Sequence, residues 1–311
     1  MLVRQLVSCC VPGFLFISGY FTNVQEVKEH TKRYYLKRLK RLFCPYICYT
    51  LLYSMYNCFQ MYRNNMEINL YDMIINNFLL GAAASHLYYI LVLLQLCLLS
   101  PIIIRILLSN RQWIKNVLFL ISPIYIAMLY VFIAYYGTYP RYYNLPFFAW
   151  FFFYYLGLYY KTNEQKMEKV VSVFGKKEMI ILSLFLCCIE AILMTCFRWG
   201  GNIVANQLKC SSIVYSFTCC MYMINRKKVN NEGINKFIMK IGDLSYGIYF
   251  IHILVKQIIE AIINRLEIST WIVRFLLCGV LTMLISVVIV YVARKVLNKG
   301  KVRNLRFIFG V

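Results

Sequence analysis

The fold is decided by residues 11–21, VPGFLFISGYF, together with the basic run that follows them. An apolar segment of membrane length ends there, and seven Lys and Arg residues then crowd residues 28–41. An apolar segment directly before a cluster of cations is typical of a membrane-spanning helix with a cytoplasmic flank. Because no small-residue cleavage site precedes the basic run, we expect a retained helix over 3–22 and not a removed signal peptide.

The composition of the whole chain also indicates a membrane protein. Hydrophobic residues make up 61% of the 311 residues, and the mean hydropathy is +0.62. A soluble domain does not bury so much apolar surface, whereas a membrane protein presents it to lipid. With about 20 apolar residues needed per span, the sequence predicts an all-α, polytopic membrane protein of about nine transmembrane helices in one domain, 1–311. The predicted spans are 3–22, 42–62, 87–108, 117–137, 145–160, 179–197, 203–224, 244–264 and 270–293.

The net charge of +22 is distributed unevenly between the predicted loops. Alternate loops hold 26 Lys and Arg residues on one side and 6 on the other. The positive-inside rule places the rich loops in the cytoplasm, which predicts an outside N-terminus and a cytoplasmic C-terminus. The charge therefore indicates membrane topology and contact with lipid, and no nucleic-acid partner. The 13 Cys are scattered, mostly in apolar runs, so we expect small hydrophobes and no metal or redox site.

Ionisable residues inside the apolar spans are the first candidates for chemistry, because burying them in lipid is costly. Tyr249, His252, Lys256 and Glu260 are spaced by three and four residues and so share one helical face. Two interpretations of this polar stripe are open. The stripe is either a packing network in which Lys256 pairs with Glu260, or the polar lining of a reaction chamber or proton path.

Further candidates lie on other spans. His86 precedes the span 87–108 and is either part of an interfacial aromatic belt or functional. Glu190 has no partner within its own span, so it is either paired across helices or protonated. Arg38 and Arg41 are three residues apart, and two guanidinium groups so placed can hold phosphate oxygens bidentately. The alternative for this basic run is contact with anionic lipid headgroups.

Several segments, taken in order, resemble the integral-membrane acyltransferase 3 family. They are VPGFLFISGY (11–20), RLKRL (38–42) with Pro45 and Tyr46, HLYY (86–89) with Pro101, FFYYLG (152–157) and GDLSYGIYFIH (242–252). The resemblance covers nearly the whole chain. It implies a multi-pass protein of the bacterial plasma membrane that transfers an acyl group, usually acetyl, to a hydroxyl of an extracytoplasmic glycan.

The donor that the resemblance implies is acyl-CoA, approached from the cytoplasm. Arg38 and Arg41 would hold its phosphates, and Ser18, Gly19 and Tyr20 would lie near the entry of the thioester. The family's catalytic His lies on a first span, and this sequence begins where the second would begin. His252 and His86 are then the remaining candidates for the general base or transient acyl carrier. We expect either a further span upstream or a truncated, non-catalytic relative. The alternative function is a proton-coupled exporter or flippase of envelope glycans.

Overall fold

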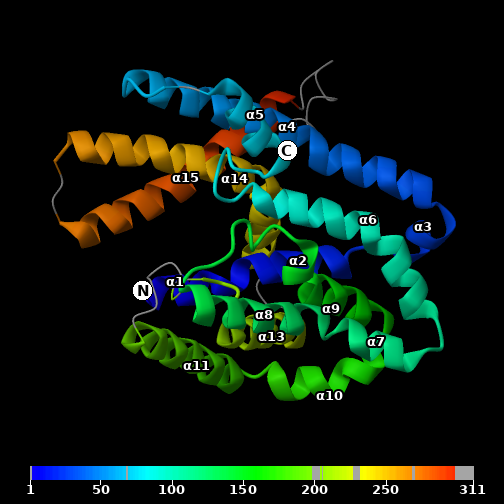
Figure 1. Ribbon diagram of the computed structural model, residues 1–311. Helices are drawn as coiled ribbons and strands as arrows, with labels where there is room; N and C mark the ends of the chain where they lie inside the picture. Colours follow the sequence, from blue (N-terminus) through cyan, green and yellow to red (C-terminus); the bar gives the residue numbers. More distant parts are fainter. Residues whose placement is uncertain are drawn as a thin grey trace. The chain divides into compact units, whose positions relative to one another are not determined.

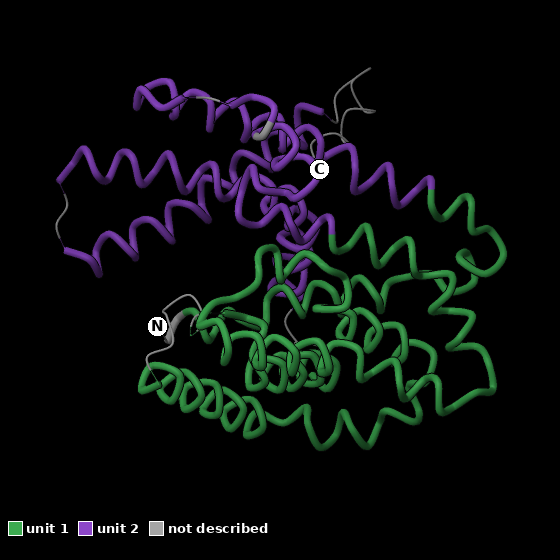
Figure 2. Tube along the Cα trace, viewed as in Figure 1, with its two compact units in different colours: residues 1–35, 92–228 green, residues 36–91, 229–311 purple. Residues whose placement is uncertain are grey.

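The computed structural model describes residues 2–67, 69–197, 204, 206–226, 232–267 and 270–297. Over these residues every regular element is a helix. The chain divides into two compact units, residues 1–35 with 92–228 and residues 36–91 with 229–311 (Figure 2). Helices α4 (Thr31–Arg63) and α6 (Tyr88–Leu108) each contribute to both units.

The first unit holds most of the helices (Figure 1). They are α1 (Leu2–Leu6), η1 (Val7–Cys9), α2 (Cys10–Tyr20), α3 (Val24–Glu29), α7 (Gln112–Leu118), α8 (Ile121–Tyr136), η2 (Phe147–Ala149), α9 (Phe151–Thr162), α10 (Glu164–Phe174), α11 (Lys177–Cys196) and α13 (Cys210–Asn225). Its core is built on the pairing of α2 with α9. A Cβ atom added to Gly19 would lie 2.2 Å from the carbonyl oxygen of Tyr154, and one added to Gly157 would lie 2.2 Å from that of Phe16. Glycine on both helices therefore allows their backbones to touch, as small residues do in membrane bundles.

The second unit contains α5 (Leu70–Leu79), α14 (Glu232–Arg265) and α15 (Trp271–Leu297) beside most of α4. Helices α14 and α15 form a long antiparallel hairpin (Figure 1). Two apolar clusters hold the hairpin together. Leu244 and Ile248 pack with Val290 in one cluster, and Val255 and Ile259 pack in the other, against which Cys278 of α15 also lies.

Five described segments are long and apolar enough to cross a membrane. They are Tyr88–Leu108, Gln112–Tyr136, Lys177–Cys196, Glu232–Arg265 and Trp271–Leu297. Many of their apolar side chains are exposed, most of all on α15, where the apolar surface has no protein partner among the described residues. The expectation of a helical, multi-pass membrane protein is confirmed.

The other four predicted spans take different forms. The segment 3–22 is divided by the η1 turn, and the helix within 145–160 has 12 residues, about 18 Å at the rise of an α-helix. The helix within 203–224 has 16 residues, and part of that span lies outside the described residues. The span 42–62 is the second half of α4, where frequent Tyr side chains lower the hydropathy. The count of nine and the orientation stay predictions.

Candidate functional site

Two predicted histidines meet in the second unit. The rings of His86 and His252 are 5.0 Å apart between centroids, although 166 positions separate them in the chain. Tyr53 and Tyr249 each set an edge against His86, at 5.6 and 5.0 Å. Both ring nitrogens of His86 are shielded from solvent and have no hydrogen-bond partner among the described residues. Burial favours the neutral imidazole, because an unpaired cation in such surroundings is costly.

The tautomer of His252 follows from its partners. Its Nδ1 lies 2.8 Å from the carbonyl oxygen of Tyr249 and 3.2 Å from that of Ile248. Carbonyl oxygens only accept, so Nδ1 carries a proton, and in the neutral imidazole Nε2 keeps its lone pair. The hydroxyl of Tyr249 donates to the carbonyl of His86, which ties α14 to the segment before α6. The nitrogen of His252 that can act as a base is therefore Nε2.

Tyr53 of α4, which the sequence analysis did not single out, supports this arrangement. Its fully buried hydroxyl donates to the carbonyl oxygen of Phe250 at 2.8 Å and accepts from the backbone N–H of Leu254 at 3.0 Å. These are the two groups that an unbroken α-helix joins directly, on either side of His252. The spacing of Tyr46, Tyr49 and Tyr53 along α4 could have indicated one buried face.

The C-terminal half of the polar stripe, Lys256 and Glu260, forms a pair of its own. Lys256 Nζ lies 3.2 Å from Glu260 Oε1, and both side chains are about half exposed. The predicted pairing of Lys256 with Glu260 is present, while Tyr249 and His252 face His86. The stripe therefore consists of two separate pairs of side chains.

Arg41 of α4 contacts α14, the helix that carries His252. Its guanidinium carbon lies 5.8 Å from the ring centroid of Tyr246, and the Tyr246 hydroxyl donates to the Arg41 carbonyl at 3.0 Å. Arg38, one turn earlier on α4, is partly exposed. The two arginines thus lie where basic α4 meets the start of the apolar part of α14. Their role in phosphate binding stays a prediction.

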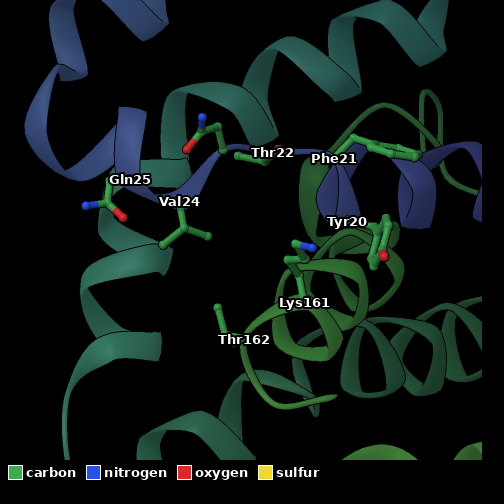
Figure 3. A pocket seen from close by; sticks show the side chains of 8 residues that line it. Tyr20, Phe21, Thr22, Val24, Gln25, Lys161 and Thr162 are labelled. Atoms are coloured by element: carbon green, nitrogen blue, oxygen red, sulfur yellow. The ribbon is translucent and has the colours of Figure 1, made fainter.

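Ser18, Gly19 and Tyr20 belong to the first unit. Gly19 serves the packing of α2 on α9, and the carbonyl of Ser18 accepts from the Thr22 hydroxyl at 2.8 Å. Tyr20 lines a cavity of about 480 Å³, and the Lys161 ammonium lies 5.1 Å from the centroid of its ring (Figure 3). The remaining lining residues are Phe21, Thr22, Asn23, Val24, Gln25 and Thr162. The cavity joins one cation to several uncharged polar groups.

A sequence profile of an acyltransferase domain family, acyltransferase 3, matches residues 1–291. The chain belongs to this family. The "probable poly-beta-1,6-N-acetyl-D-glucosamine export protein" of Staphylococcus aureus strains MRSA252, MSSA476 and MW2 is similar to it, with 26% identity in each case. Each alignment covers 86% of this chain and 75% of the relative. No solved structure matches the chain.

In this acyltransferase family member, the segments that carried the resemblance lie against one another within each unit. Residues 11–20 and 152–157 are the α2 and α9 faces joined at Gly19 and Gly157. Residues 86–89 and 242–252 bring together His86, Tyr249 and His252. The motif residues therefore serve both helix packing and the histidine pair.

Glu190 finds its partners across helices. It accepts from the hydroxyl of Tyr130 on α8 and from both the backbone N–H and the hydroxyl of Ser211 on α13, the N–H at 3.0 Å. A buried cation that was not predicted as a candidate lies nearby in the chain. Lys209 is fully buried, and its Nζ donates to Gln5 Oε1 at 2.9 Å. The hydrogen bonds of Glu190 to Tyr130 and Ser211 favour the first of its two alternatives, pairing across helices.

Proposed function

We propose that the chain is an O-acyltransferase of the bacterial plasma membrane. It would move an acyl group, in the first instance acetyl, from cytoplasmic acyl-CoA to a hydroxyl of an extracytoplasmic glycan. The observation that carries the proposal is the His86–His252 pair, in which Nε2 of His252 is left basic inside an apolar helix of an acyltransferase family member. The proposed topology is the nine-span arrangement with an outside N-terminus, which follows from the charge of the loops.

The proposed chemistry is general-base catalysis. Nε2 of His252 takes the proton of the acceptor hydroxyl, whose oxygen attacks the thioester carbonyl. The carbon–sulfur bond then breaks, and the departing thiolate receives the proton from the imidazolium. Tyr249 and Tyr53 hold the base, and His86 closes the site against water.

The placement of Arg41 is consistent with a donor that carries phosphates. Arg41 contacts Tyr246, and His252 lies six residues further along α14, about 9 Å at the helical rise. Phosphates held at the basic end by Arg38 and Arg41 would leave the flexible arm of acyl-CoA to reach deeper into the membrane. Ser18, Gly19 and Tyr20 stay our prediction for the entry of the thioester.

The test uses inverted membrane vesicles that contain the full chain and are loaded with a β-1,6-linked N-acetylglucosamine oligosaccharide. Acetyl-CoA labelled in its acetyl group is added outside, and alkali-labile label on the oligosaccharide is measured. We expect transfer by the wild type and a loss of about 100-fold or more in His252→Gln, with acetyl-CoA binding retained. His30→Gln is the matched control, because His30 is an exposed histidine of the basic region.

Two results would count against the proposal. Full transfer by His252→Gln would remove His252 as the base. If the wild type transfers acetyl neither to this oligosaccharide nor to any of a panel of other envelope glycans, acyl transfer itself would be contradicted. Loss of acetyl-CoA binding in the Arg38→Ala/Arg41→Ala variant is expected if these arginines hold the phosphates.

Glycan export is the second candidate, favoured by the names of the relatives. Its prediction differs, because polymer would cross the vesicle membrane without acetyl-CoA and in response to a pH gradient. Glu260, paired with Lys256, is the residue to change. Export blocked by Glu260→Gln, together with no acetyl transfer, would favour the exporter over the enzyme.

A further inference from the structure

A cationic cavity lies at one end of the α14–α15 hairpin, away from the histidine pair. It has a volume of about 420 Å³. Its lining residues are Lys240, Asp243, Leu244, Tyr291, Arg294 and Lys295. Because α14 and α15 are antiparallel, the start of the apolar part of one helix meets the end of the apolar part of the other.

The cavity carries an excess of positive charge. Arg294 Nη1 lies 3.9 Å from Asp243 Oδ2, which offsets one cation. Lys240 and Lys295 form no ion pair with any residue that the structure describes. An anion entering the cavity would thus meet two uncompensated ammonium groups and the remaining N–H donors of a guanidinium.

The cations border apolar surface. Leu244, which lines the cavity, and Val290, next to the lining residue Tyr291, belong to the buried cluster of the hairpin. On the exposed surface of α15, three valines recur every four residues. The side chains of Val288, Val292 and Val296 are 58%, 51% and 62% exposed. That spacing places them in one stripe, next to the positions of Tyr291 and Lys295. The cavity therefore has a charged mouth at the point where the hydrocarbon-facing surface begins.

We propose that this cavity binds the headgroup phosphate of an anionic phospholipid. The phosphate lies among Lys240, Arg294 and Lys295, and an acyl chain follows the exposed valine stripe of α15. Basic pockets between membrane helices are the usual sites of such headgroups on the cytoplasmic side. Free phosphate shares the charge complementarity but leaves the apolar stripe unused, so the lipid is the occupant that matches both surfaces.

Native mass spectrometry of the full chain in detergent tests the proposal, with dioleoyl phosphatidylglycerol titrated against dioleoyl phosphatidylcholine. We expect the wild type to bind phosphatidylglycerol, whose headgroup is anionic, more tightly than phosphatidylcholine. The Lys240→Gln/Lys295→Gln variant should bind it roughly 30-fold more weakly, about 2 kcal/mol, from near 1 kcal/mol per cation. The charge-matched control, Lys236→Gln/Lys169→Gln, removes two exposed ammonium groups outside the cavity and should bind like the wild type.

Two further measurements distinguish lipid binding from misfolding of the variant and from binding of free phosphate. Lys240→Arg/Lys295→Arg should retain lipid binding, which distinguishes lost charge from misfolding. Inorganic phosphate alone should not raise the unfolding temperature as the lipid does, and an equal rise would assign the cavity to free phosphate. The proposal is wrong if Lys240→Gln/Lys295→Gln binds phosphatidylglycerol like the wild type, or if the wild type binds both lipids equally.

Discussion

At the scale of single residues, hydrogen bonds to the backbone decide what His252 can do. The carbonyl of Tyr249 fixes the proton on Nδ1, and Tyr53 ties together the backbone on either side of the ring. A side chain that enters the hydrogen-bond ladder of a helix is a known cause of local distortion. Tyr53 is therefore a positioning residue for His252 in the proposed reaction.

Replacing Tyr53 with Phe tests this role. The change removes a buried hydroxyl that makes two hydrogen bonds and adds no atom. We expect a loss of about 1–3 kcal/mol in the free energy of unfolding, because the partners Phe250 and Leu254 must find other arrangements. Acetyl transfer should fall as well. Thermal unfolding in detergent and the vesicle assay measure the two effects.

The control for this change is Tyr62→Phe on the same helix. Tyr62 is 77% exposed, so its hydroxyl is expected to contribute little. Equal unfolding temperatures for Tyr53→Phe and Tyr62→Phe would contradict the positioning role.

At the scale of elements, the contact of α2 with α9 depends on two glycines. In Gly157→Ala the new Cβ atom would meet the Phe16 carbonyl oxygen at 2.2 Å and the Tyr20 backbone nitrogen at 2.7 Å. Both are backbone atoms, so the helices must separate. We expect destabilisation of about 1–3 kcal/mol or more, measured as a lower unfolding temperature.

Gly279→Ala provides the matched comparison. Gly279 lies in α15, where an added Cβ would meet nothing within 4 Å. Alanine there should be neutral or stabilising by up to about 1 kcal/mol, because it lowers the conformational entropy of the unfolded chain. A Gly157→Ala protein as stable as Gly279→Ala would show that α2 and α9 do not pack this closely.

At the scale of the whole molecule, the alternation of basic loops predicts the side of the membrane on which each loop lies. Alkaline phosphatase fused after residue 137 should be active, since that loop is predicted outside and the enzyme folds there. The same reporter fused after residue 163, in the basic loop 161–177, should be inactive. β-Galactosidase fusions at the two positions should give the opposite pattern. Reversed activities would overturn the proposed orientation.

Hydropathy, charge and residue spacing carried the prediction of a helical membrane protein, and the resemblance of short sequence motifs carried that of its family. These are local properties, because a span is recognised by about 20 consecutive residues and a helical face by spacings of three and four. The face that carries Tyr249 and His252, and the cation pair Arg38 and Arg41, were therefore readable from the chain. The number of spans was harder to predict from the sequence, since η1 interrupts the first segment and α9 is short.

The sequence by itself determined the class, the family and the residues from which a site could be built. Only the tertiary structure decided which of them meet. It placed His86 against His252, inserted Tyr53 beside them and paired Glu190 with Tyr130 and Ser211. The physical reason is that such contacts join positions far apart in the chain. They depend on how closely helices pack, which is set by details such as the glycines of α2 and α9.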